Sequence, residues 1–356
     1  MSTVIAEPAE VTPAWLEEVL ARSGLVDAQV ASVRLRGRTR GPFSVRAFFD
    51  LTYGGGTTFL APTRMFLKLP IPELQASRDM LRDEVRFYQM FGDDSRLPLV
   101  HCFDAQHSVE TGAAHLLLQD LSDTHSNPPP PVPPTLGQAE AMVDALLRFH
   151  TRWWDSPELG VQIGERWQAG SIEQAVQFTS NHFSRFRDLV GDRWSAQRWQ
   201  IYEAVLANWP RLLGRLVDQP NLTLIHGDAH AWNCLLPNQP GLDPAYLIDL
   251  CTCRVRPPAN DLAYMMALMW FGDVRARWER PLLERYHDGL LSAGIERYSW
   301  DDFLRDYQFA VIVHLFTPVF QAASDTIAPT TWWYSLERIC AAYQDLECEQ
   351  LLDSPR

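Results

Sequence analysis

The first 120 residues contain short stretches in which aromatic and β-branched side chains recur, as is typical of strands. We predict strands at 30–36, 43–53, 64–69, 99–103 and 114–119. A helix begins at Thr12-Pro13 and runs to about residue 22, because a cap residue followed by proline favours a helix start. The stretch 77–91 has apolar residues at helical spacing, with Ser77 as the expected N-cap. This part therefore reads as a β-sheet with one inserted helix.

The pattern changes after Asp120-Leu121. Residues 128–134 hold six prolines, which exclude a helix or a central strand and predict an extended segment. Helical patterns then dominate, at 136–154, 170–190, 194–217, 260–270, 276–293, 301–324 and 331–352. Two short β-type stretches, 222–226 and 245–250, interrupt the helices, and each leads into a loop that carries a carboxylate. The fold class is therefore α+β, with a β-rich first part and a mainly helical second part.

One lysine stands out in the composition. Of the 31 basic residues, Lys68 is the only lysine, and it lies in one of the predicted strands. An ammonium group is a compact point charge, whereas a guanidinium group is a wide planar fork, so the two are not interchangeable at a tight site. Lys68 is either a chance survivor or a residue that arginine cannot replace, and its position favours the second interpretation.

Charge and cysteine content narrow the functional classes. The formal net charge of −13 argues against a nucleic-acid partner. The sequence has no run of about eighteen apolar residues, which argues against a membrane partner. The polar, acidic stretch 1–10 does not resemble a secretory signal, and six scattered cysteines do not form a disulfide framework. We therefore expect a cytoplasmic protein with free thiols.

The chemistry is concentrated after the two short β-type stretches. The segment His226-Gly-Asp-Ala-His-Ala-Trp-Asn233 follows the first, and Asp249 follows the second. Phosphoryl transfer needs a carboxylate that orients or deprotonates the attacking hydroxyl and oxygen ligands that bind Mg²⁺. It also needs a lysine that binds the phosphates, and an acidic side chain usually holds this lysine in place. The chain supplies this set as Asp228, Asn233, Asp249, Lys68 and Glu84.

These motifs carry a family resemblance. His-Gly-Asp-x-His-x-x-Asn, then Ile-Asp, then Pro-x-x-Asp-Leu-Ala resembles the aminoglycoside phosphotransferase superfamily, which includes choline-kinase-like and ecdysteroid-kinase-like enzymes. The resemblance is strongest over 222–268 and weaker at Lys68, Glu84 and 116–121. It implies a bilobal, protein-kinase-like fold, with an ATP-binding lobe at 1–118, a hinge at 119–123 and a helical lobe at 124–356.

The resemblance also implies a role for each matching residue. Asp228 would be the catalytic base, and Asn233 and Asp249 would bind Mg²⁺. Five residues would bind ATP: Lys68, Glu84, Ser44 in the loop over the phosphates, and Gln119 and Leu121 at the adenine. His226 and Asp261 would support the loop that carries the base. The sequence departs from the family in two places: Leu250-Cys251 stands where many relatives have an aromatic residue, and the loop at 41–44 contains a proline and follows a basic segment.

The implied activity is ATP-dependent phosphorylation of a hydroxyl group on a small molecule. Only eleven residues separate Asp249 from Asp261, too few for the segment on which protein kinases bind peptides. Residues 122–356 carry 19 arginines against 29 acidic residues, which favours a cationic or hydroxyl-rich acceptor such as an amino sugar, an amino alcohol or another natural product. Two alternatives remain: a non-catalytic nucleotide-binding protein of the same fold, and a metal-dependent hydrolase with a zinc site drawn from His226, His230, Cys234, Cys251 and Cys253.

Overall fold

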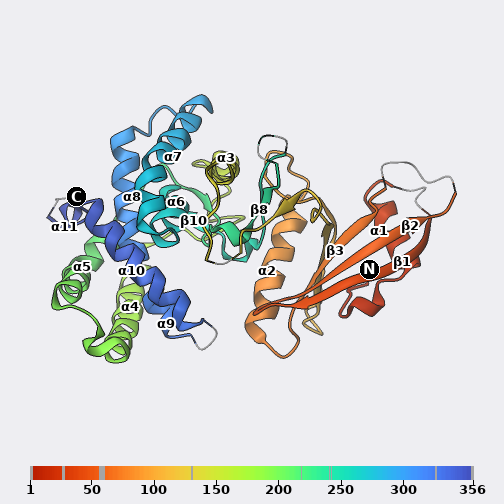
Figure 1. The fold of residues 1–356 in the computed structure, drawn as a ribbon, viewed down its shortest axis with the longest axis horizontal. Coiled ribbons are helices and arrows are strands. Elements are labelled where there is room, and N and C mark those ends of the chain that lie inside the picture. Colours follow the sequence, from red (N-terminus) through yellow and green to blue (C-terminus); the bar gives the residue numbers. More distant parts are fainter. Residues whose placement is uncertain are drawn as a thin grey trace. The chain divides into compact units, whose positions relative to one another are not determined.

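The computed structural model describes residues 3–25, 29–55, 61–129, 131–217, 219–239, 241, 243–324 and 327–353. The chain divides into two compact units (Figure 1). The first unit comprises Met1–Ser126 and Tyr246–Thr252, and the second comprises Asn127–Ala245 and Cys253–Arg356. The division thus falls after Ser126, a few residues beyond the predicted hinge, and the short segment that contains Asp249 is part of the first unit.

The first unit is built on a five-stranded antiparallel sheet. The strand order is β1-β2-β3-β5-β4, with β1 at Val30–Arg40, β2 at Val45–Tyr53, β3 at Arg64–Leu69, β4 at Cys102–His107 and β5 at Ala114–Gln119. Helix α1 spans Pro13–Arg22, and helix α2 spans Gln75–Phe91. The predicted β-rich first part is confirmed. Strand β1 runs further than predicted, so the turn before β2 is confined to 41–44, where Gly41 N–H donates to Ser44 O at 2.8 Å.

Alternation along β3 decides which way its side chains face. Met65, Leu67 and Leu69 are buried in an apolar core that also contains residues of β2 and α1. Because successive side chains of a strand point to opposite faces, Lys68 lies on the other face. Helix α2 packs against β4 and β5 and buries Leu81, Glu84, Val85, Tyr88 and Phe91. Its apolar spacing is as predicted, and Glu84 is on the same buried stripe.

The expected role of Ser77 as the N-cap of α2 is wrong. The helix begins at Gln75, so Ser77 lies inside its first turn and is fully buried. Its hydroxyl accepts a hydrogen bond from Ile71 N–H at 2.7 Å and donates one to Phe43 O at 2.6 Å. A serine can therefore tie the helix start to the turn at 41–44, because its hydroxyl both donates and accepts.

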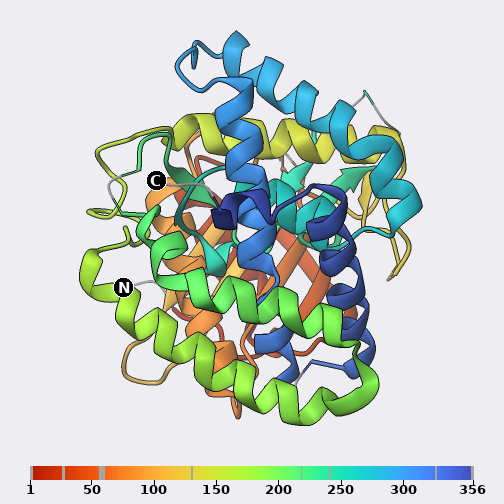
Figure 2. The same ribbon diagram turned by 90° about the vertical axis from the view of Figure 1, so that its left-hand side faces the viewer.

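The second unit is mainly helical, as predicted, and Figure 2 shows its helices in yellow-green to blue. The helices are α3 at Leu136–Trp153, α4 at Ala169–Val190, α5 at Ala196–Gly214, α6 at Ala259–Ala263, α7 at Gly272–Ser292, α8 at Trp300–His314, α9 at Thr317–Ala322, α10 at Pro329–Asp345 and α11 at Gln350–Asp353. Short strands β7 (Thr223–Ile225) and β10 (Arg254–Arg256) pair antiparallel. Within the described residues, no helix is long and apolar enough to cross a membrane.

The centre of this unit is α6, which is entirely buried and packs against α8. A buried π-helical turn, Tyr264–Leu268, continues it. The single helix predicted at 301–324 is divided into α8 and α9 around Leu315, because Pro318 in the first turn of α9 has no N–H to continue a helix. The hydroxyl of Tyr202 donates to Leu315 O at 2.7 Å and so satisfies a carbonyl at the break.

Replacing Ser77 with alanine should lower the free energy of unfolding by about 1–3 kcal/mol, because the buried Ile71 N–H and the part-buried Phe43 carbonyl each lose their partner. Ser180→Ala, at an exposed position of α4, is the matched control and should change it by no more than about 0.5 kcal/mol. Urea unfolding of both variants measures the difference. Equal effects of the two substitutions would contradict the assignment.

Candidate active site

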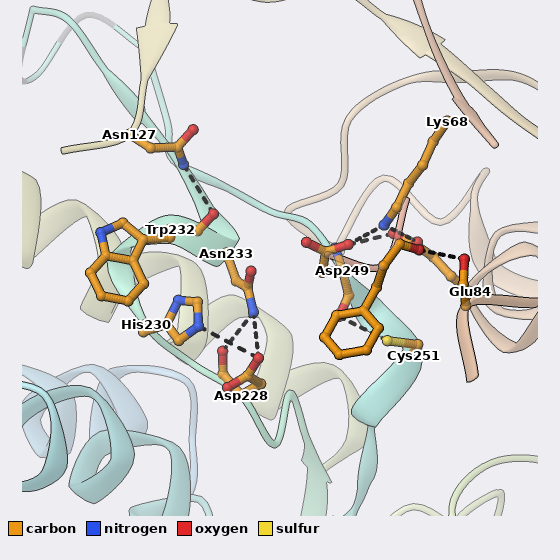
Figure 3. A network of polar contacts seen from close by, with 11 residues as sticks. Lys68, Glu84, Asn127, Asp228, His230, Trp232, Asn233, Asp249 and Cys251 are labelled. Atoms are coloured by element: carbon orange, nitrogen blue, oxygen red, sulfur yellow. Dashed lines mark hydrogen bonds and ion pairs between the residues drawn. The ribbon is translucent and has the colours of Figure 1, made fainter. Parts of the chain in front are cut away.

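Lys68, Glu84 and Asp249 form a connected set in the first unit (Figure 3). Lys68 Nζ lies 2.5 Å from Glu84 Oε2 and also pairs with Asp249 Oδ1. The Glu84 side chain is 3% exposed and that of Lys68 13%, whereas that of Asp249 is 41% exposed. Lys68 comes from β3, Glu84 from α2 and Asp249 from the segment Tyr246–Thr252. The structure brings the three together, and the contact between Lys68 and Asp249 was not predicted.

Glu84 organises this set with both of its oxygens. While Oε2 contacts Lys68, Oε1 accepts a hydrogen bond from the backbone N–H of Asp249 at 3.1 Å. Asp249 has a φ of +61°, a conformation that aspartate tolerates better than most residues. Burial alone would lower the pKa of the Lys68 ammonium, but the charges of Glu84 and Asp249 and hydrogen bonds to both raise it. The ammonium group is therefore charged over the whole physiological pH range.

In the second unit, the loop 226–233 follows β7 and is held by a buried carboxylate. Asp261 of α6 is fully buried and accepts hydrogen bonds from His226 N–H at 2.7 Å and Gly227 N–H at 2.8 Å. His150 Nε2 lies 3.1 Å from the same carboxylate. Gly227 has a φ of +82°, which a residue with a Cβ rarely adopts. The Asp261 side chain thus holds the start of the loop backbone in place.

Asp228 lies at the centre of this loop (Figure 3). The side-chain amide of Asn233 donates to Asp228 Oδ2 at 2.8 Å and to the Asp228 carbonyl at 3.0 Å. His230 Nε2 lies 3.5 Å from Asp228 Oδ2, and the Asp228 side chain remains 34% exposed. Burial would raise the pKa of Asp228, but the charge of and hydrogen bond from His230, with a hydrogen bond from Tyr264, lower it below the ordinary aspartate value. Asp228 is therefore an ionised, accessible carboxylate.

Each unit contains a side-chain oxygen of the kind that a hard cation binds. Because the Asn233 nitrogen donates to Asp228, its side-chain oxygen is the atom that can serve as a ligand. In the first unit, Asp249 offers an accessible carboxylate oxygen, and Mg²⁺ prefers oxygen ligands. The zinc alternative has no comparable support: among the residues that the structure describes, no three His, Cys, Asp or Glu side chains are grouped as a metal site.

Residues 35–300 match the model of the phosphotransferase enzyme family. The chain belongs to this family. A search of curated protein sequences finds no match. The predicted membership is confirmed, since the match covers both the strand with Lys68 and the loop with Asp228.

Solved structures of the phosphotransferase family have the same fold at low identity. Macrolide 2'-phosphotransferase MphH from Brachybacterium faecium is 16% identical, with a TM-score of 0.50 and coverage of 96% of this chain and 98% of that one. The GDP complex of a variant aminoglycoside 2'-phosphotransferase-IIIa is 11% identical, with a TM-score of 0.52 and coverage of 95% and 98%. A choline/ethanolamine kinase family protein from Mesorhizobium loti is 12% identical, with a TM-score of 0.50 and coverage of 94% and 97%.

Three residues predicted to bind ATP, Ser44, Gln119 and Leu121, use some of their backbone groups in hydrogen bonds within the protein. Ser44 lies in the turn between β1 and β2, where its carbonyl accepts from Gly41 N–H. Gln119 N–H donates to His101 O at 2.9 Å, and Leu121 O accepts from Thr124 and His125 N–H. An adenine contact would therefore have to use the Gln119 carbonyl and the Leu121 N–H.

Sequence reasoning missed four residues that hold the 226–233 loop. His150 contacts Asp261, Tyr264 donates to Asp228, and Arg254 Nη2 donates to Gly227 O at 2.8 Å. The Asn127 side chain donates to the carbonyls of three residues that end this loop or follow it, at 2.7–3.3 Å: Ala231, Trp232 and Cys234. His150 and Asn127 lie far from the loop in sequence, so no local spacing could identify them.

Replacing Asp261 with asparagine should lower the free energy of unfolding by about 2–4 kcal/mol at neutral pH, because a buried carboxylate with three donors loses its charge and one acceptor. Asp188→Asn, at an exposed position of α4, is the matched control, with an expected change of no more than about 0.5 kcal/mol. Urea unfolding measures both.

The pH dependence of this difference is a further expectation. Burial would raise the pKa of Asp261, but the hydrogen bond and charge of His150, the charge of His226 and the Gly227 N–H lower it. A lowered pKa in the folded state stabilises the protein above the unfolded-state pKa, and this contribution is lost as the pH falls. The gap between wild type and Asp261→Asn should therefore narrow from about pH 6 to about pH 3. A gap that widens toward acid would contradict the assignment.

Proposed function

We propose that this protein transfers the γ-phosphoryl group of ATP to a hydroxyl group of a small molecule. The observation that carries the proposal is the set formed by Lys68, Glu84 and Asp249. A permanently charged ammonium that is positioned by a buried glutamate beside an accessible carboxylate suits the binding of metal-complexed phosphates. Membership in the phosphotransferase enzyme family also supports nucleotide binding, as does the similarity to a GDP-bound structure.

Each part of the site has a role in this proposal. Lys68 binds the nucleotide phosphates, and Glu84 positions it. Ser44 lies in the turn that covers the phosphates, and Gln119 and Leu121 bind adenine. Asn233 and Asp249 hold Mg²⁺, which when bound supplies positive charge that offsets the negative charge on the phosphates.

Asp228 acts on the acceptor. Its carboxylate accepts a hydrogen bond from the acceptor hydroxyl, orients the oxygen, and receives the proton as the new bond forms. The hydroxyl oxygen forms a bond to the γ-phosphorus while the bond from that phosphorus to the β-phosphate oxygen breaks, and ADP leaves with the electron pair. The lowered pKa of Asp228 keeps it ionised before the reaction. His226 and Asp261 support the loop and take no part in the transfer.

An ATP-consumption screen tests this function. Candidate acceptors include aminoglycosides, amino alcohols, nucleosides, sterols and sugars, with generic protein substrates alongside. We expect phosphorylation of at least one small alcohol and of no protein. Binding of Mg-ATP with no turnover on any acceptor would instead favour a non-catalytic nucleotide-binding protein, and phosphorylation of proteins alone would overturn the proposal.

Substitutions of the two accessible aspartates should have different effects. Asp228→Asn should leave the Kd for Mg-ATP within about threefold of wild type and lower turnover by about 1000-fold, because only the acceptor loses its base. Asp249→Asn should weaken Mg-ATP binding by about tenfold or more, because a metal ligand is lost. Isothermal titration calorimetry measures the binding, and the ATP-consumption assay measures turnover. Equal losses of Mg-ATP affinity in the two variants would reverse or void the assignments.

Lys68→Met should lower turnover by about 100-fold or more, because the nucleotide phosphates lose a positive charge that is held in position beside them. Arg34→Met removes a positive charge from a largely exposed position of β1 and serves as the control, with expected turnover near that of wild type. Steady-state kinetics at saturating acceptor compares the two. Near-normal turnover of Lys68→Met would remove the basis of the nucleotide site.

A further inference from the structure

A pocket of about 410 Å³ opens in the second unit beside Asp228. Its walls are residues 131–134 of the proline segment (residues 128–134, with Pro130 outside the described residues), residues 230–232 of the 226–233 loop, residues 269–270, and part of α10. His230, which lies 3.5 Å from Asp228, is one of the lining residues. A volume of this size holds a drug-sized molecule. The pocket is therefore placed to present a hydroxyl group to Asp228.

The lining differs from the acidic pocket that the net charge predicts. Within the described part of the chain, no aspartate or glutamate lines it, although the whole protein has a formal charge of −13. Most of the lining is apolar or aromatic, with Trp232, Trp270 and Tyr334 as its largest side chains. Arg338 is the lining residue that carries a permanent positive charge. Such a lining disfavours an ammonium group and favours a flat, apolar molecule.

Arg338 is available to an anion. Its Nη1 donates to Met269 O at 2.9 Å, its Nη2 donates to Ser335 Oγ at 3.4 Å, and its guanidinium group lies over the ring of Phe271. Each of these two nitrogens has a second N–H that can donate to a ligand. Burial lowers the pKa of Arg338 to about 10, and within the described part of the chain no carboxylate offsets this effect. A half-buried cation that has no carboxylate partner among the described residues is the feature that a ligand carboxylate or carbonyl oxygen would complement.

The proline segment makes one wall of this pocket rigid. Proline fixes φ and has no N–H to donate, so 131–134 present an apolar surface that needs few backbone hydrogen bonds. Asn127, just before this segment, donates to three carbonyls at 2.7–3.3 Å, one of them that of Trp232. The wall is thereby tied to the loop that carries Asp228. A pre-formed wall lowers the entropy cost of binding a rigid ligand.

We infer that the acceptor, given the proposed phosphotransferase function, is an alcohol with a flat apolar body and a carboxylate or carbonyl oxygen that binds Arg338, and that it carries no ammonium group. Binding would place the apolar body against Trp232, Trp270 and the proline wall. The hydroxyl group would face Asp228. Amino sugars and amino alcohols are thereby excluded as preferred acceptors.

The test uses three matched sets of hydroxymethyl-substituted aromatic and alicyclic compounds that differ only in one group: a carboxylate, a methyl ester or an aminomethyl group. Ligand-observed NMR measures binding without nucleotide, and the ATP-consumption assay measures turnover. We expect the carboxylates and esters to bind at least about tenfold more tightly than the amines. Tighter binding of the amines, or no binding in any set, would overturn the inference. Because binding is measured without nucleotide, a failed phosphotransfer alone would instead count against the proposed function.

Two variants locate the binding. Arg338→Gln should remove most of the preference for carboxylates and esters over amines, whereas Arg338→Lys should retain part of it. Tyr334→Ala, at a residue that is 45% exposed, should weaken all carboxylates and esters by about tenfold without opening the core. Arg280→Gln, on the exposed face of α7, is the matched control and should leave the preference unchanged. Circular dichroism confirms that each variant is folded, and an unchanged preference in Arg338→Gln would contradict the role of Arg338.

Discussion

The ammonium group of Lys68 lies between two carboxylates, and the arrangement of the first unit around its site follows from this contact. Buried charges are tolerated only when they are paired and hydrogen-bonded. Glu84 therefore has to lie on the buried stripe of α2, and β3 has to present Lys68 on the face opposite Leu67 and Leu69. Because Glu84 also accepts the Asp249 N–H, the segment Tyr246–Thr252 becomes part of this unit although it is distant in sequence.

In the second unit, a buried carboxylate also holds a backbone segment in place by accepting hydrogen bonds from its N–H groups. Asp261 accepts two backbone N–H groups of the 226–233 loop, as Glu84 accepts that of Asp249. In both cases a fully or nearly fully buried acid holds the backbone, and an accessible aspartate lies on that backbone. Because the backbone of each segment is held by a buried acid, Asp228 and Asp249 can be accessible to solvent and still have a defined orientation.

The sequence predicts more of the elements than of the contacts between them. Periodicity identifies the strands and most of the helices, and the motif at 226–233 identifies the loop, because both signals are local. The cap at Ser77 is wrong since only the packed structure shows that its hydroxyl joins Ile71 to Phe43. His150 and Asn127 could not be identified because their partners lie more than 100 positions away. The net charge likewise does not reveal the pocket lining, since acidic residues can lie elsewhere on the surface.

The central claim, that Lys68 binds nucleotide phosphates, can be measured on the native protein because the chain has one lysine. Biosynthetic labelling with ¹³C-lysine should give one side-chain ε-carbon signal in an NMR spectrum. Its pH titration should lie above that of a free lysine, since Glu84 and Asp249 raise the pKa. The account predicts that Mg-ATP, at concentrations that saturate binding by calorimetry, shifts this signal. A signal that does not move while Mg-ATP binds would contradict it.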